Sequence, residues 1–163
     1  MKHALTITKS GDRDLVMTRE FNAPRTLVYD AHTKPELVRQ WLGGLPGWTM
    51  PVCDMDVRVG GTYRWVWRKE EGSEEMGMGG VYREVKAPER LVTTEKFDEA
   101  WYPGESLNTL VLTETAGRTM LTQTMRYESS AAREAVIESD MESGVTASYD
   151  RLDNVLAATT TTR

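Results

Sequence analysis

One stretch near the C-terminus, residues 130–156, constrains the fold more than any other part of the sequence. It contains no proline and a single glycine, and residues that favour helices occur throughout it. Its apolar residues recur every three or four positions, which is the spacing of one face of an α-helix. We therefore expect one long amphipathic helix, whose shared face consists of Ile137, Met141, Val145, Ser148, Tyr149, Leu152 and Leu156.

Most of the preceding chain alternates apolar and polar residues with the period of a β-strand. Two short helices interrupt this alternation after residue 21, because Pro24 begins one helical pattern and Gly43 ends a second. The expected strands are residues 4–8, 14–21, 52–59, 62–69, 76–85, 91–97, 107–114 and 119–127.

A sheet with one apolar face must cover that face, and the only element long enough to do so is the C-terminal helix. The order of elements therefore predicts an α+β fold, in which a curved antiparallel sheet wraps around the long helix. No linker or internal repeat divides the chain, so we expect one domain over residues 1–158. Residues 159–163 are expected to form a disordered tail.

Composition and charge narrow the classes of function. The chain has 25 acidic and 20 basic residues, whereas a general nucleic-acid binder needs a basic surface. One cysteine, Cys53, cannot form an internal disulfide, and together with two histidines it leaves little material for a metal site. No apolar run approaches the ~20 residues of a membrane span, and the first residues turn polar too soon for a signal peptide. We therefore expect a cytoplasmic protein without a membrane or nucleic-acid partner and without a cofactor.

Aromatic residues gather on one face of a predicted hairpin. A turn at Gly72-Ser73 pairs Trp67 with Met78, Trp65 with Gly80 and Tyr63 with Tyr82, and all of these lie on the same face. Two interpretations stay open. The residues form a filled core in which a glycine accommodates a tryptophan, or they line an apolar pocket for a small molecule.

The last hairpin places two neutral amides on the apolar face. A turn at Ala116-Gly117 sets Leu110 against Gln123 and Asn108 against Met125. Burying an amide costs a few kcal/mol unless it is hydrogen-bonded. The two amides are satisfied by each other, by water, or by a ligand that they orient.

Charged residues at inward strand positions are the remaining candidates for chemistry. Arg19 and Glu84 are expected to form a structural ion pair at the rim of the sheet. The strand pattern does not decide which way Glu95 points; if it points inward, burial raises its pKa and makes it a candidate acid or base, with Glu84 as the second candidate. His32, at a helix end, is expected to be solvated, and Cys53 to be a buried, inert thiol.

Large aromatic residues are also expected in two loops. Trp48 follows the second short helix, and Trp101 and Tyr102 lie between the predicted strands 91–97 and 107–114. Aromatic residues in such loops form a lid, an interface or a partly buried contact.

Several segments in order resemble one known family. They are residues 19–24 (REFNAP), 33–36 (TKPE), 56–64 (DVRVGGTYR), 80–85 (GVYREV) and 149–152 (YDRL). Together they resemble the family named after the activator of the Hsp90 ATPase. The resemblance implies the START/Bet v 1-like helix-grip fold, with a cavity between the sheet and the long C-terminal helix. Leu42 and Val145 stand where this family often has aromatic residues, so the shape of the pocket is expected to differ.

The resemblance implies no universal catalytic motif, and three hypotheses follow from it and from the residues. The first is a carrier or sensor that binds a small hydrophobic molecule. The second is an enzyme of the cyclase, dehydratase or hydrolase kind acting in the same cavity, and the third is an interaction module that forms a homodimer or contacts an Hsp90-type chaperone. The residues expected to contact a ligand are Tyr63, Trp65, Trp67, Met78, Tyr82, Asn108, Leu110, Gln123, Met125, Met141, Val145, Ser148 and Tyr149.

Overall fold

The computed structural model describes residues 3–99 and 104–161. Within these residues the elements are, in chain order, β1 (Thr6–Ser10), β2 (Asp14–Phe21), α1 (Arg25–Thr33), α2 (Pro35–Trp41), β3 (Trp48–Met55), β4 (Thr62–Lys69), β5 (Glu75–Lys86), β6 (Arg90–Phe97), β7 (Ser106–Thr115), β8 (Arg118–Arg126), α3 (Ser130–Glu138) and α4 (Met141–Thr161).

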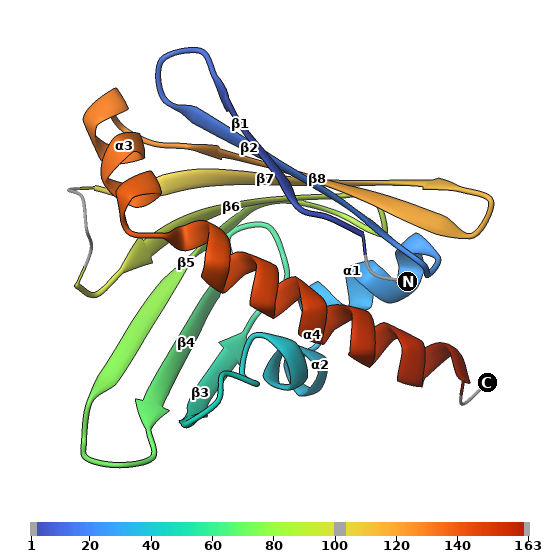
Figure 1. The fold of residues 1–163 in the computed structure, drawn as a ribbon, viewed down its shortest axis with the longest axis horizontal. Helices are drawn as coiled ribbons and strands as arrows, with labels where there is room; N and C mark the ends of the chain where they lie inside the picture. The colour runs from blue at the N-terminus through green and yellow to red at the C-terminus, as the bar shows by residue number, and fades with distance from the viewer. Residues whose placement is uncertain (1–2, 100–103, 162–163) are drawn as a thin grey trace.

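The strands form one antiparallel sheet in the order β1-β2-β8-β7-β6-β5-β4-β3. The sheet curves, and α4 lies across its concave face (Figure 1). The two short helices α1 and α2 follow β2 and pack against α4. This arrangement confirms the α+β helix-grip fold predicted from the sequence.

The C-terminal helical stretch is two helices, so the prediction of one continuous helix over residues 130–156 is wrong. Its break lies at Ser139 and Asp140, where Asp140 adopts a left-handed backbone conformation with φ of 60°. Such a conformation ends an α-helix because it turns the chain out of the helical path. The helix α4 then continues to Thr161, into the stretch expected to be a tail, and residues 162–163 lie outside the described part of the chain.

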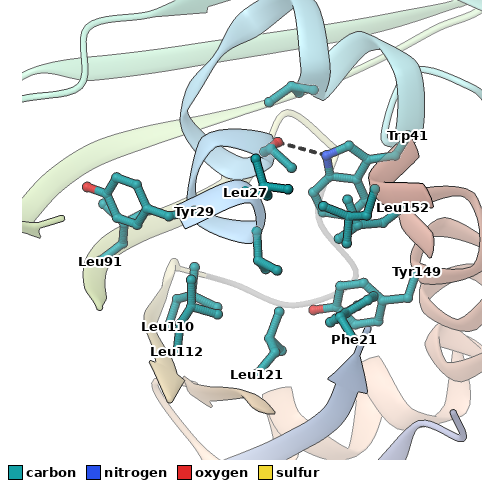
Figure 2. Close-up of a cluster of buried hydrophobic side chains, with 14 of the residues drawn as sticks. Phe21, Leu27, Tyr29, Trp41, Leu91, Leu110, Leu112, Leu121, Tyr149 and Leu152 are labelled. Atoms are coloured by element: carbon teal, nitrogen blue, oxygen red, sulfur yellow. Dashed lines mark hydrogen bonds between the residues drawn. The ribbon is translucent and has the colours of Figure 1, made fainter. Parts of the chain in front are cut away.

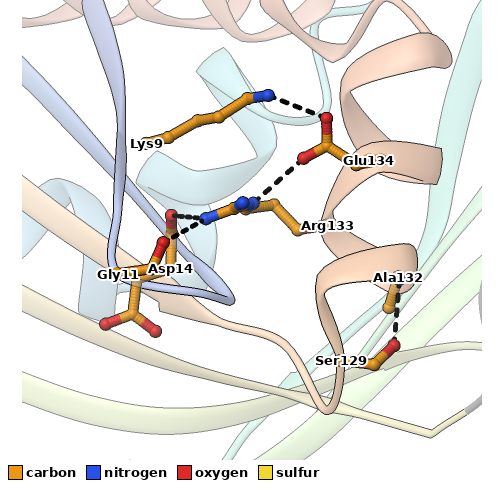
Figure 3. A network of polar contacts seen from close by, with 7 residues as sticks. All are labelled: Lys9, Gly11, Asp14, Ser129, Ala132, Arg133 and Glu134. Carbon is orange, nitrogen blue, oxygen red and sulfur yellow. Dashed lines mark hydrogen bonds and ion pairs between the residues drawn. The ribbon is translucent and has the colours of Figure 1, made fainter.

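The short helix α3 is tied to the turn between β1 and β2 by polar contacts (Figure 3). Nη1 of Arg133 donates hydrogen bonds to the carbonyl oxygens of Gly11, over 3.0 Å, and Asp14, over 3.3 Å. Glu134 pairs with both Arg133 and Lys9. These contacts hold α3 over one end of the sheet, whereas α4 runs across the concave face (Figure 1).

The β4–β5 hairpin differs from its predicted register by two residues. The backbone N–H of Lys69 donates to the carbonyl of Glu74 over 2.9 Å, so the loop contains four residues instead of two. A shift of two residues leaves every side chain on its predicted face, because side chains alternate with period two. The observed pairs are Tyr63 with Gly80, Trp65 with Met78 and Trp67 with Met76.

Gly80 is required by a close approach of two strands and not by an indole ring. A Cβ on Gly80 would lie 1.8 Å from the carbonyl oxygen of Thr94 on β6. The hydroxyl of Tyr63 donates to the same carbonyl over 2.7 Å. The interpretation in which Gly80 accommodates Trp65 is therefore wrong, since Trp65 pairs with Met78.

A β-bulge changes the direction of Glu84. The register between β5 and β6 shifts between Tyr82 and Glu84, so one extra residue intervenes there. After this bulge Val85 packs toward the core, while Glu84 faces away and pairs with Arg90. The predicted ion pair between Glu84 and Arg19 is wrong.

Arg19 is instead paired with the C-terminal helix. Its side chain is buried, and Nη2 donates to Oδ1 of Asp150 over 2.9 Å and also to Asp153. Both carboxylates lie on α4, three residues apart, so they share one face of that helix. This charge cluster fixes α4 to strand β2.

An apolar cluster joins α1, α2 and α4 to the sheet (Figure 2). The ring of Tyr149 packs edge-on against Phe21, with centroids 5.6 Å apart, and stacks on Trp41 at 5.9 Å. Nε1 of Trp41 donates to the carbonyl of Ala31 over 2.8 Å. The indole therefore connects the two short helices to each other and to α4.

Candidate ligand-binding cavity

A cavity of about 440 Å³ lies between the concave face of the sheet and the helices α3 and α4. Apolar and aromatic side chains make up most of its lining. The structure brings together there all the residues predicted to contact a ligand: Tyr63, Trp65, Trp67, Met78, Tyr82, Asn108, Leu110, Gln123, Met125, Met141, Val145, Ser148 and Tyr149.

The strands β4 and β5 supply an aromatic wall. The ring centroids of Tyr63 and Trp65 are 4.8 Å apart, those of Tyr63 and Tyr82 5.5 Å, and those of Trp65 and Trp67 6.4 Å. Nε1 of Trp67 donates to the carbonyl of Leu42 over 2.9 Å. The rings pack against one another, and those of Tyr63 and Trp67 also donate hydrogen bonds to backbone carbonyls. The wall is therefore preorganised for a ligand.

Three polar side chains cross the concave face on neighbouring strands. They are Glu95 on β6, Asn108 on β7 and Gln123 on β8, and all line the cavity. Nδ2 of Asn108 donates to Oε2 of Glu95 over 3.0 Å, and the hydroxyl of Ser106 donates to Oδ1 of Asn108 over 3.3 Å. The amide of Asn108 is thus oriented from one side so that its N–H group faces the carboxylate.

The structure answers the question of which way Glu95 points: it faces the cavity. Burial raises the pKa of Glu95 from its usual 4.5 to about 7, and the hydrogen bond from Asn108 opposes this rise. The carboxyl therefore changes its charge near neutral pH. The other predicted acid, Glu84, lies outside the cavity because of the bulge in β5.

A model of the family described as "Activator of Hsp90 ATPase homolog 1-like protein" matches residues 22–157. The chain belongs to this family.

Solved structures share the fold of this chain. A protein from Rhodobacter sphaeroides is 33% identical, with a TM-score of 0.87 over 94% of this chain and 98% of the other. Ms6760 from Mycobacterium smegmatis is 23% identical, with a TM-score of 0.82 over 96% and 99% of the two chains. An HSP90 activator from Plasmodium falciparum is 20% identical, with a TM-score of 0.53 over 70% and 72%, and shows a shared fold alone. None of the curated proteins compared with the chain matches it.

In this family member, His32 lines the cavity, although the sequence predicted a solvated residue. Its Nδ1 donates to the carbonyl of Val28 over 2.8 Å, and its ring packs edge-on against Trp41 with centroids 5.0 Å apart. Burial lowers the pKa of His32 to about 4, so the imidazole is neutral at neutral pH. The prediction was wrong because α2 folds back and covers the end of α1.

Arg151 is a cavity residue that sequence reasoning missed. Nε donates to the carbonyl of Trp41 over 2.7 Å, and Nη2 donates to the hydroxyl of Ser148 over 3.2 Å. Arg151 sits on α4 three residues after Ser148, a predicted cavity residue, so helical spacing could have placed it on the same face. The other lining residues that were not among the predicted ligand contacts are Met17, Trp41, Leu42, Leu45, Met76, Leu91, Thr93, Phe97, Tyr127, Val136, Ser139 and Gly144.

The remaining predicted residues lie elsewhere. Cys53 is a buried free thiol, as predicted, and burial raises its pKa. Trp48 is the first residue of β3 and packs partly against the core, so its placement in a loop was wrong. Trp101 and Tyr102 lie outside the described residues.

Neither a metal site nor a membrane-spanning helix is present within residues 3–99 and 104–161. No three His, Cys, Asp or Glu side chains of these residues lie close enough together to hold a metal ion. No helix in the same ranges is long and apolar enough to cross a membrane.

Proposed function

We propose that this protein binds a small hydrophobic or aromatic molecule in the cavity between the sheet and α4, as a carrier or a sensor. The observation that supports this most is a cavity of about 440 Å³ whose lining is mostly apolar and includes a row of polar side chains on β6, β7 and β8. Small-molecule sites generally have volumes of about 300–1,000 Å³ and combine apolar walls with a few polar groups. Close-packed protein cores contain few voids larger than a water molecule, so a cavity of this size needs an explanation other than imperfect packing.

Two polar groups are available to orient the ligand. The side chain of Gln123 lines the cavity and is half-buried, so its amide is accessible to a ligand. Glu95 offers Oε1, because its Oε2 is bonded to Asn108. The ligand would place its polar group against this row and its apolar part against Trp65 and Trp67.

Native mass spectrometry of protein purified from cells, followed by tryptophan-fluorescence titration with a panel of lipophilic compounds, tests this function. We expect a co-purified or added compound at a ratio of one per chain. If no compound binds, and a crystal structure shows the cavity filled by the protein's own side chains, the proposal fails.

An enzyme acting in the same cavity is the second candidate, and the buried carboxyl of Glu95 is the observation that favours it. A carboxyl that changes charge near neutral pH is suited to general acid–base catalysis. If Glu95→Gln leaves the turnover of every accepted substrate unchanged, this candidate fails.

The name of the family also makes an Hsp90-type chaperone a candidate partner. A pull-down with that chaperone tests such a contact, and light scattering tests a homodimer. Both measurements are independent of the cavity.

A further inference from the structure

Glu95 is the only carboxylate among the described residues that line the cavity, and it has no cationic partner there. Every ion pair found in the described chain lies elsewhere, including the cluster of Arg19 with Asp150 and Asp153. A buried carboxylate without a counter-ion is costly, because an apolar environment solvates charge poorly. No positive charge among the described residues of the cavity therefore balances the carboxylate of Glu95.

The geometry of the carboxyl leaves one oxygen available. Oε2 accepts the hydrogen bond from Asn108, whose amide is held by Ser106. Oε1 has no hydrogen-bond partner among the described residues, and it is not one of the polar atoms sealed from solvent. A donor that enters the cavity can therefore reach it.

The other titratable groups of the cavity do not neutralise Glu95. Burial raises the pKa of Tyr82 and Tyr149 above the usual range, so these phenols are uncharged at neutral pH. The imidazole of His32 is uncharged as well, because burial lowers its pKa to about 4. The guanidinium of Arg151 does not contact Glu95; it donates instead to the backbone carbonyl of Trp41 and to the hydroxyl of Ser148. The titratable groups of the cavity besides Glu95 are the phenols of Tyr63, Tyr82, Tyr127 and Tyr149, the imidazole of His32 and the guanidinium of Arg151.

We propose that the ligand carries a protonated amine, which donates to Glu95 while its apolar part lies against the aromatic wall. This inference rests on the proposed function, since it names the class of molecule that the same cavity takes. Asn108 supports it, because a donor to the carboxylate stabilises the ionised form that a cation needs. Within the cavity, a pair of ammonium and carboxylate would have less contact with water than at the surface, which strengthens a charge-assisted hydrogen bond.

Two probes of the same shape test this inference: 2-(1-naphthyl)ethylamine and 2-(1-naphthyl)ethanol, measured by isothermal titration calorimetry at pH 8 and pH 5.5. At pH 8 we expect the amine to bind about tenfold or more tightly than the alcohol, because hydrogen bonds to charged groups are the stronger ones. At pH 5.5 the advantage of the amine shrinks, since Glu95 is then largely protonated. Binding of the alcohol changes little between the two pH values.

The variant Glu95→Gln keeps the shape of the side chain and an acceptor for Asn108, and we expect it to abolish both the preference for the amine and its pH dependence. If the alcohol binds as tightly as the amine to the native protein at pH 8, the inference is overturned, while the proposed function stands. If neither probe nor any lipophilic compound binds, the proposed function itself fails. The native protein gives these results without the variant, so a folding defect in Glu95→Gln does not prevent the test.

Discussion

Nδ2 of Asn108 donates a hydrogen bond to Oε2 of Glu95 over 3.0 Å, and the two residues lie on neighbouring strands of the concave face. Burial favours the neutral carboxyl, whereas this hydrogen bond favours the ionised one. The burial effect is the larger, so the pKa of Glu95 rises to about 7.

The stability of the protein should therefore depend on Glu95 as the pH changes. The folded state holds the proton of Glu95 more tightly than the unfolded state, so folding loses stability as the pH rises from about 4.5 to about 7. We expect Glu95→Gln to be more stable than the native protein by about 1–3 kcal/mol at pH 8. Urea unfolding at several pH values measures this difference, which should vanish near pH 4. A difference that is constant with pH would contradict a raised pKa of Glu95.

Replacing Asn108, which donates the hydrogen bond to Glu95, should raise the pKa of Glu95 further. In Asn108→Leu, the carboxyl of Glu95 loses the hydrogen bond that stabilises its charge, so its pKa rises further above the usual range. Carbon-13 NMR of the Glu95 carboxyl across pH measures this directly. Thr113→Ala, on an exposed position of the same strand, is the control and should leave the titration unchanged.

The charge cluster between β2 and α4 should be a large contributor to stability. Arg19→Leu leaves Asp150 and Asp153 without their cation. Asp153 is largely buried but Asp150 is partly exposed to water, so we expect a loss of about 3 kcal/mol, the lower end of the cost of breaking a buried pair. The exposed pair of Arg68 and Glu75 is the control, and Arg68→Ala should cost less than about 1 kcal/mol. Thermal unfolding compares the two. Equal losses would show that burial does not make the Arg19 cluster more important than an exposed pair.

The strand register was predicted correctly from the sequence where a tight turn connects the two strands. The turn at Ala116-Gly117, where both residues have positive φ, sets Asn108 opposite Met125 in the β7–β8 hairpin, as predicted. The face of the β4–β5 hairpin was also predicted, although its loop is two residues longer than assumed, because a shift of two preserves the alternation.

The errors have a common physical origin in contacts between distant segments or in single irregular residues. After the bulge that precedes Glu84, the side chains of β5 point to the face opposite to the one that strict alternation predicts. Alternation alone cannot locate such an extra residue. His32 is covered by a helix that folds back on it. The break at Ser139 and Asp140 did have a local signal, since both residue types favour helix ends over helix interiors.

Filling the cavity should weaken ligand binding without unfolding the protein. Val145 is half-buried on α4 and lines the cavity, so Val145→Phe places a larger ring in the space of the ligand. We expect about tenfold weaker binding of 2-(1-naphthyl)ethanol by fluorescence titration, corresponding to overpacking of about 1–3 kcal/mol. Ile137→Phe, at an exposed position on α3, is the control. Unchanged affinity in Val145→Phe would indicate that the probe binds elsewhere.

Methionine methyl groups report most directly on whether a small molecule occupies the cavity. Five methionines line it, whereas Met120 is exposed on the outside of β8. The five are Met17, Met76, Met78, Met125 and Met141. In NMR spectra of protein labelled with carbon-13 at the methionine methyls, we expect 2-(1-naphthyl)ethanol to shift signals of these cavity methionines and to leave that of Met120 unchanged. If the cavity signals stay unchanged at saturating probe, or if only Met120 responds, the cavity is not the binding site.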